Sequence, residues 1–111
     1  MAVSKKPVAT YQILAESEPG TLPRILELFA LNSSVPFSVV AMRAGEETQR
    51  VVIETDDLTE QRARIIEAKL KAVFTVYAAS CSFVPHKSQH LVEAFHDSKA
   101  AVGQDRMALT A

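Results

Sequence analysis

Residues 16–22, with the sequence ESEPGTL, have the residue types best suited to bind a small ligand. A strand-like run ends there and a helix-like run begins, so the first backbone N–H groups of the helix are free to bind an anion. Gly20 has no Cβ and lets a ligand approach the backbone, and such a helix end suits a carboxylate. A purely structural interpretation is also open: Gly20 makes the turn, Thr21 caps the helix and Pro23 occupies its first turn.

Three histidines near the C-terminus have a spacing that could suit a metal ion. His86 and His90 are four residues apart and would share one face of a helix, with His96 close by. Imidazole is a common zinc ligand. The simpler interpretation is a polar tail with ordinary histidines, because Pro85 precedes them and would keep His86 outside the helix. We therefore expect no metal and no cofactor.

No other residues form a recognisable catalytic group. Cys81 lies within a strand-like run, and no histidine has a sequence context that argues for pairing with it. A nucleophilic cysteine needs both an activating base and an open cleft. Asp57 is explained as a helix cap and Asp56 as a turn residue, and the sequence contains no P-loop, GxGxxG or CxxC motif. The sequence thus predicts a protein that is not an enzyme.

Hydrophobic periodicity predicts the elements that would hold residues 16–22 in place. Residues 8–15 alternate apolar and polar side chains, as in a half-buried strand. In residues 21–31 the apolar residues recur at the spacing of a helix that faces a core. Residues 57–60 (DLTE) resemble a capping box with Asp57 as the cap. The predicted strands are 8–15, 37–43, 50–55 and 75–84, and the predicted helices are 21–31 and 57 to about 71.

The order of these elements, β-α-β-β-α-β, predicts an α+β fold. The short polar segment 44–49 contains Gly45 and predicts a hairpin between the second and third strands. The natural packing is a ferredoxin-like sandwich, in which a four-stranded antiparallel sheet carries both helices on one face. Residues 8–84 would form this domain. Residues 85–111 would be a C-terminal extension, with a short helix at 88–99 and a flexible end.

The face of the sheet without helices is predicted to be unusually apolar. Val40, Met42 and Val52 would point away from the helices if their strand neighbours point inward. The fourth strand would add two apolar residues in either orientation: Val76 and Ala78, or Tyr77 and Phe83. We expect this face, or the adjoining edge, to pair with another subunit as a homodimer or higher oligomer. The alternative is that the C-terminal extension folds over it.

Composition excludes several classes of function. The chain has 111 residues, 48% of them hydrophobic and 23% charged, which suffices for one globular domain. A net charge of -1 offers no basic surface for nucleic acid or for a membrane. No apolar run is long enough to span a bilayer, and the N-terminus lacks the apolar region of a secretory signal. With a single cysteine, these features predict a cytoplasmic protein.

The segment EPGTLPRILELFA resembles the first strand-to-helix turn of ACT domains. The hallmark of that family is Pro-Gly-x-Leu followed by Ile one helical turn later, and Pro19, Gly20, Leu22 and Ile25 match it. The stretch TDDLTEQRARIIEAKLKAVFTVYAA is similar to the second helix and fourth strand of ACT domains, notably those of acetolactate synthase small subunits. The resemblance covers about residues 8–84.

The resemblance implies a ligand site between two domains. ACT domains are regulatory modules that typically bind amino acids at such an interface, where the ligand meets the loop before the first helix. Ser17 stands where the family often has Asp or Asn, and the segment SSVPF stands where it often has Gly-x-Asn-Ile. The implied contacts are Ser17, Pro19, Gly20, Thr21 and Leu22 of one copy, with Pro36 and Phe37 of a neighbouring copy.

Three functional hypotheses follow from these observations. The first is a small regulatory module that binds an amino acid such as valine, leucine or isoleucine and regulates a partner enzyme. By the resemblance, that partner would be a thiamine-dependent catalytic subunit. The second is a ligand-free interaction or dimerisation module with the same fold. The third is a small enzyme or metal-binding protein that uses the C-terminal histidines.

Overall fold

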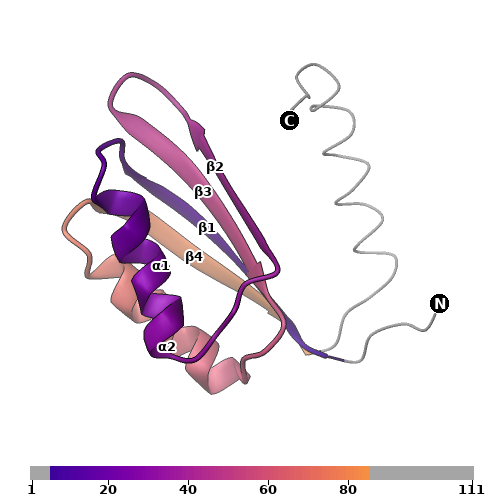
Figure 1. The fold of residues 1–111 in the computed structure, drawn as a ribbon. Helices are drawn as coiled ribbons and strands as arrows, with labels where there is room; N and C mark the ends of the chain where they lie inside the picture. Colours follow the sequence, from indigo (N-terminus) through magenta and orange to yellow (C-terminus); the bar gives the residue numbers. More distant parts are fainter. Residues whose placement is uncertain (1–5, 86–111) are drawn as a thin grey trace, which may run out of the picture. The chain divides into compact units, whose positions relative to one another are not determined.

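The computed structural model describes residues 6–85, which form the predicted sheet and helices (Figure 1). The predicted helix at 88–99 and the three histidines lie outside the described residues, as does most of the predicted extension. The order of the elements is βαββαβ. Their bounds are β1 Val8–Glu16, α1 Thr21–Leu31, β2 Ser38–Arg43, β3 Thr48–Thr55, α2 Glu60–Lys71 and β4 Val76–Val84.

The four strands form one antiparallel sheet in the order β2-β3-β1-β4. Both helices lie on the same face of this sheet, as Figure 1 shows. The predicted ferredoxin-like fold is therefore confirmed. Its topology makes β1 a central strand and places β2 and β4 at the two edges, so the β1–α1 loop leaves the middle of the sheet.

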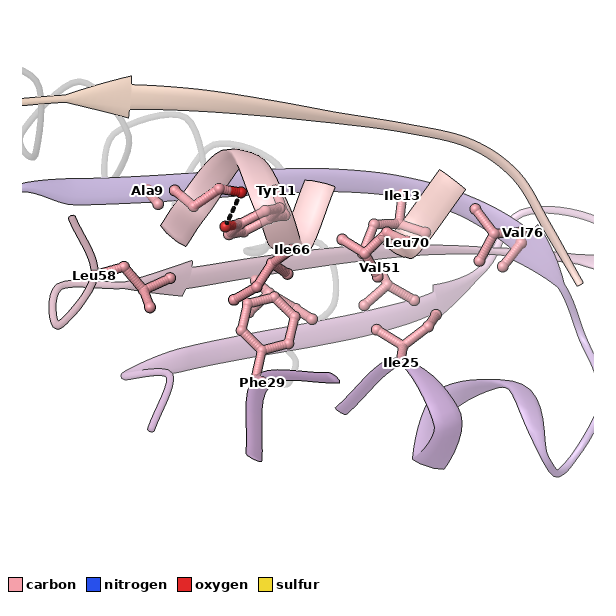
Figure 2. Close-up of a cluster of buried hydrophobic side chains, with 13 residues drawn as sticks. Ala9, Tyr11, Ile13, Ile25, Phe29, Val51, Leu58, Ile66, Leu70 and Val76 are labelled. Carbon is pink, nitrogen blue, oxygen red and sulfur yellow. Dashed lines mark hydrogen bonds between the residues drawn. The ribbon is translucent and has the colours of Figure 1, made fainter. Parts of the chain in front are cut away.

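The core lies between the sheet and the helices, and Tyr11 is at its centre (Figure 2). Tyr11 is fully buried, and its hydroxyl donates a 2.9 Å hydrogen bond to the backbone carbonyl of Ala63 in α2. Its ring meets that of Phe29 in α1 edge to face, with centroids 5.0 Å apart. One side chain of β1 thus contacts both helices. Burial in the core, with Cys81 close by, raises the pKa of the Tyr11 hydroxyl far above its ordinary value.

The predicted cap of α2 is wrong, because Asp57 binds elsewhere. Thr59 is the N-cap, and its hydroxyl accepts the N–H of Arg62 at 3.2 Å. The Asp57 carboxylate instead accepts the Val35 N–H at 2.7 Å and the Ser34 hydroxyl at 2.7 Å. The Thr55 hydroxyl also donates to it. This carboxylate therefore joins the α1–β2 loop to the loop after β3, a contact between distant segments that a local capping pattern cannot predict.

Neither of the two outward pairs predicted for β4, Val76 with Ala78 or Tyr77 with Phe83, is found in the structure. The β1–β4 register shifts between Leu14 and Ala15, which is the mark of a bulge. Val76 pairs with Ala15 and is buried, whereas Ala78 and Tyr77 are both exposed. The Val76 side chain at the start of β4 is therefore buried in the core, and the Tyr77 side chain is exposed to solvent.

The sheet face opposite the helices is mixed rather than uniformly apolar. Val40 and Val52 are cross-strand neighbours on it, as predicted, but the same row continues through Gln12 to Ser80. In the next row, Met42 and Leu14 are separated by Arg50 and followed by Ala78. The larger apolar side chains thus gather towards the β2 end of this face. Its pairing with another subunit stays a prediction.

Replacing Tyr11 with Phe removes one buried hydrogen bond and keeps the ring packing. We expect the free energy of unfolding to fall by about 1–2 kcal/mol, the usual range for such a bond. For a domain of this size the melting midpoint should fall by roughly 5 °C or more. Urea and thermal unfolding followed by circular dichroism would measure this. Tyr77→Phe is the control, since Tyr77 is exposed. An equal loss of stability in both variants would contradict the role of the Tyr11 hydroxyl.

Asp57 should make the stability of the fold depend on acid pH. Burial tends to raise the pKa of this carboxyl, but hydrogen bonds from Thr55, Val35 and Ser34 outweigh burial and hold the pKa below its ordinary value of 3.8. The ionised form is therefore favoured by the fold. Its contribution is fully present above the unfolded-state pKa and is lost as the pH falls through the lower folded-state pKa.

We expect Asp57→Asn to destabilise the protein by about 1–2 kcal/mol at pH 7, since the amide accepts fewer hydrogen bonds. The difference in the free energy of unfolding between wild type and variant should narrow as the pH falls below about 4. Urea unfolding at pH values from 2.5 to 7 would measure it. Asp56→Asn is the matched control, because the Asp56 side chain makes no hydrogen bond with the described residues. A gap that does not change with pH would contradict this assignment.

Candidate ligand-binding site

The loop between β1 and α1, residues 17–20, is held at both sides by backbone hydrogen bonds. The N–H of Ser17 donates to the carbonyl of Glu47 in the β2–β3 hairpin at 2.9 Å. The N–H of Glu16 donates to the carbonyl of Thr75 in the α2–β4 loop at 2.7 Å. The side-chain amide of Gln49 adds a 3.0 Å bond to the carbonyl of Glu16. The loop is therefore fixed between the hairpin and the α2–β4 connection.

At the start of α1, the predicted cap is wrong and the N–H of Gly20 already has an acceptor. Gly20 is the N-cap residue and provides no side-chain cap, whereas Thr21 is the first residue of the helix. The Thr21 side chain is turned inward, only 1% exposed, and its hydroxyl has no hydrogen-bond partner among the described residues. The carboxylate of Glu18 accepts the N–H of Gly20 at 3.1 Å. The Glu18 carboxylate thus lies at the position where a bound anion was predicted.

Two open hollows flank the loop, and Glu18 lines both. The hollow on the side of β2 has a volume of about 340 Å³, and the hollow on the side of β4 has about 280 Å³. The β2-side hollow is lined by Ser17, Glu18, Pro19, Ala41, Met42, Arg43 and Gln49. The β4-side hollow is lined by Glu18, Gly20, Arg24, Val73, Phe74 and Thr75.

The structure divides the predicted contact residues into separate groups. Ser17 and Pro19 line the β2-side hollow, Gly20 lines the β4-side hollow, and Leu22 packs against the core. Pro36 and Phe37 lie at the far end of the sheet, since the N–H of Phe37 donates to Glu54, which pairs with Thr10 near the start of β1. Within one chain these last two residues do not meet the loop.

Several residues that line the hollows were missed by the sequence analysis. Arg43 and Gln49 pair across the β2–β3 hairpin, and Gln49 also pairs with Ala15 at the end of β1. The predicted hairpin could have revealed this, because it returns the chain to the end of β1. Neither Arg43 nor Arg24 forms an ion pair with any other described residue. Among the described residues, each therefore offers a guanidinium without an ion-pair partner beside the loop.

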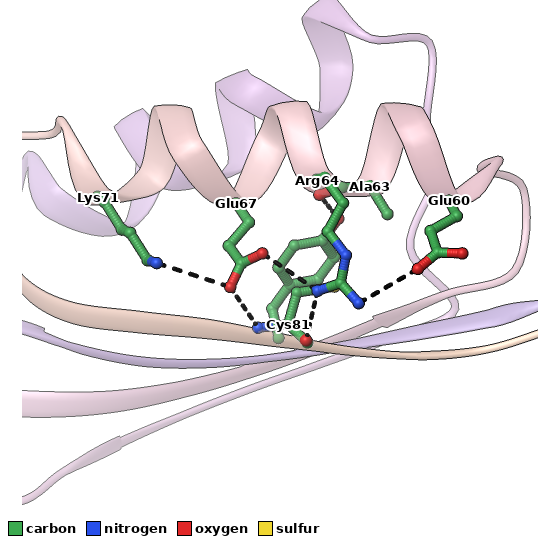
Figure 3. A network of polar contacts seen from close by, with 7 residues as sticks. Glu60, Ala63, Arg64, Glu67, Lys71 and Cys81 are labelled. Carbon is green, nitrogen blue, oxygen red and sulfur yellow. Dashed lines mark hydrogen bonds and ion pairs between the residues drawn. The ribbon is translucent and has the colours of Figure 1, made fainter.

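Side chains of α2 cover the backbone of β4 at one edge of the sheet (Figure 3). The carboxylate of Glu67 accepts the N–H of Cys81 at 3.1 Å, and the guanidinium of Arg64 donates to the carbonyl of Cys81 at 2.9 Å. Arg64 also pairs with Glu67 and Glu60. An edge strand whose backbone groups are satisfied in this way is a poor template for another strand. No described strand or helix side chain covers the outer edge of β2 in this manner.

Other chemistry finds little support among residues 6–85. Cys81 is half-buried, and burial raises the pKa of its thiol, which disfavours the reactive thiolate. Within the described residues no group of histidine, cysteine and acidic side chains could hold a metal ion. No helix in this part of the chain is long and apolar enough to span a membrane.

The part of the chain that forms the βαββαβ sandwich matches a family model. The model for the ACT-like domain matches residues 3–88 of the chain. The chain belongs to the ACT-like domain family. The type found in acetolactate synthase small subunits is not shown, and no curated protein sequence matches this chain.

Solved structures show the same fold at low sequence identity. The ACT domain of GTP pyrophosphokinase from Chlorobium tepidum has a TM-score of 0.55 and 13% identity, covering 68% of this chain and 96% of that one. The C-terminal domain of MgtC from Mycobacterium tuberculosis has a TM-score of 0.61 and 13% identity, covering 80% and 99%. The ligand-free regulatory subunit of aspartate kinase from Thermus thermophilus has a TM-score of 0.55 and 13% identity, covering 76% and 54%.

Glu67→Ala should expose the edge of β4. We expect it to leave the Cys81 N–H without its partner, to lower the free energy of unfolding by about 1–2 kcal/mol, and to increase aggregation during heating. Thermal unfolding with light scattering would measure both effects. Glu67→Gln keeps an oxygen acceptor and serves as the matched control. Equal behaviour of the two variants would show that the side-chain oxygen does not protect this edge.

Proposed function

We propose that this chain is a regulatory ACT-like domain that binds an amino acid between its β1–α1 loop and strand β2 of a second copy. The observation that supports this most directly is the β2-side hollow of about 340 Å³. It lies between the loop and the end of an edge strand, beside the sheet edge that α2 does not protect. A second copy paired along this edge would enclose the open side of a ligand bound there.

Antiparallel pairing of β2 with β2 of a second copy would complete the site. In such a pair, the Arg43 end of one strand lies beside the Ser38 end of the other, by two-fold symmetry. The partner's Pro36 and the partner's Phe37 would then approach the hollow beside Ser17. This accounts for the two groups of predicted contact residues, which lie at opposite ends of the sheet in a single chain.

Exposed apolar residues next to β2 favour the same pairing. Phe37 and Val39 are 48% and 41% exposed, although the pairing of Val39 with the buried Ile53 places Val39 on the helix side of the sheet. Leu31 at the end of α1 and Val35 in the α1–β2 loop are more exposed still. Pairing of two copies along β2 would remove part of this apolar surface from water.

The lining of the hollow suits a small zwitterion with an aliphatic side chain. Ser17 offers a hydroxyl and Arg43 a guanidinium, while Pro19, Ala41 and Met42 offer apolar surface. Valine, leucine and isoleucine have this chemistry. One of the similar structures is a regulatory subunit of aspartate kinase, and we extend the proposal to regulation of a partner enzyme. A thiamine-dependent synthase remains the candidate partner that the sequence resemblance implies.

A ligand-free interaction module is the second candidate function. It is favoured by the hydrogen bond from the Gly20 N–H to Glu18, which leaves that amide satisfied without a ligand. Phe74 in the α2–β4 loop is 96% exposed, which suits a protein contact. In this case the chain would act through its surfaces alone.

A thermal-shift screen of the purified protein against the twenty amino acids distinguishes the two candidates. A ligand at 100 times its dissociation constant adds about 2.7 kcal/mol of stability, which should raise the melting midpoint by several degrees. We expect a saturable shift for one or a few amino acids, with valine, leucine and isoleucine titrated first. No shift with any of the twenty would favour the ligand-free module.

The same screen on two variants tests whether the site needs a second copy. Val39→Lys places a charge on the exposed side of β2, and we expect a monomer by light scattering and a loss of the ligand-induced shift. Phe74→Lys is the matched control, since it adds the same charge at an exposed apolar position away from β2. A Val39→Lys variant that is monomeric and still shows the full shift would contradict the shared site.

A further inference from the structure

Glu18 and Arg43 give the β2-side hollow two opposite charges that do not neutralise each other. Both residues line it, and neither forms an ion pair with any described residue. Glu18 is fixed by the 3.1 Å hydrogen bond from Gly20 to its carboxylate. Arg43 is fixed at the backbone by its pairing with Gln49 at the end of the β2–β3 hairpin. The negative group thus belongs to the loop and the positive group to β2.

This arrangement argues against a ligand carboxylate at the start of α1. The N–H of Gly20 already donates to the Glu18 carboxylate and the N–H of Thr21 to the Glu18 carbonyl, so neither is available to a ligand carboxylate. A second carboxylate there would have to displace Glu18 or lie beside it, where two like charges repel each other. An ammonium group at the same place would gain a charge-assisted hydrogen bond from Glu18.

Arg43 has the charge that would bind the carboxylate of the same ligand. A guanidinium presents a planar set of donors that matches a carboxylate at two points. Because Arg43 has no ion-pair partner among the described residues, its donors are available to a ligand. Pro19 and Ala41 add apolar surface to the same hollow, where an aliphatic side chain would lose contact with water.

We propose that the β2-side hollow binds its amino acid in one orientation, with the α-ammonium group on Glu18 and the α-carboxylate on Arg43. This inference rests on the proposed function and assigns the polarity of the same site. It makes Glu18 and Arg43 the two specificity-determining residues. It also implies a selectivity: the ligand must carry both charges, and an acid without an amino group is rejected by Glu18.

Three probes of the same shape test this polarity. L-valine carries both charges, isobutylamine lacks the carboxylate, and 3-methylbutanoate lacks the amino group. We expect calorimetric titration of the full chain to show tightest binding of L-valine and weaker binding of both analogues, because each analogue loses one charge pair and meets a like charge on the other residue. If the amino-acid screen selects another ligand, its amine and acid analogues replace these probes.

Neutral variants assign each charge to its residue. Glu18→Gln should weaken binding of L-valine and of isobutylamine about tenfold, and Arg43→Gln should weaken binding of L-valine by a similar factor without weakening that of isobutylamine. The matched controls are Glu47→Gln in the hairpin and Arg62→Gln on α2, which remove the same charges from exposed positions that do not line the hollow. Both controls should leave every affinity unchanged.

The outcomes separate this inference from the proposed function. If Glu18→Gln strengthens the binding of L-valine, the ligand carboxylate sits at α1 and the polarity is overturned, while amino-acid binding stands. If binding persists unchanged in both variants, the site lies elsewhere. If the wild-type protein binds none of the twenty amino acids, the proposed function fails, and the polarity fails with it.

Discussion

The hydrogen bond from the Tyr11 hydroxyl to the Ala63 carbonyl sets the position of α2, and much of the molecule depends on that position. A buried hydroxyl needs a partner, so the bond fixes α2 against the middle of β1. From there, Glu67 and Arg64 reach the backbone of β4 at Cys81. The core contact therefore has a consequence at the surface: side chains of α2 cover β4 at one edge of the sheet, and neither described helix covers β2 at the opposite edge in this way.

The ends of the sheet differ because the chain connections place different groups there. At the end where β1 leads into α1, the hairpin and the α2–β4 loop hold residues 17–20 through backbone bonds. At the opposite end, the Asp57 carboxylate binds Ser34 and Val35 and so joins the α1–β2 loop to the loop after β3. Both connections of α1 are thus fixed by contacts from other segments. A rigid loop suits a binding site, because little conformational freedom is lost when a ligand binds.

Local sequence patterns were sufficient to predict the fold, and they failed where distant segments interact. Alternation in β1 and the apolar stripe of α1 report directly on which face is buried, so the architecture followed from them. Thr21 and Asp57 looked like helix caps because capping patterns are local. In the structure Thr21 is buried and Asp57 is held by a loop more than twenty residues away.

Only part of the candidate site could be predicted from the sequence, because the rest is formed by residues that are distant along the chain. Residues 17–20 could be recognised from their motif, since helix starts have a local signature. Arg43 and Gln49 carry no such signature, and they come near the loop only through the register of β2, β3 and β1. The bulge at Ala15 similarly depends on how two strands fit together. Side chains that strand register brings together can be predicted only when the pairing of the strands is already known.

A site divided between the loop of one copy and strand β2 of another would couple two equilibria. Because a ligand that contacts both copies binds the pair more tightly than the single chain, it must also favour pairing by the same free energy. The coupling works in reverse: a partner protein that stabilises or separates the β2 edges would change the affinity for the ligand by the same factor. A small domain could regulate an enzyme by this means alone, since the edge strand would both line the ligand site and form the contact between copies. The position of β2 at the sheet edge that neither described helix covers is therefore the feature on which such regulation would depend.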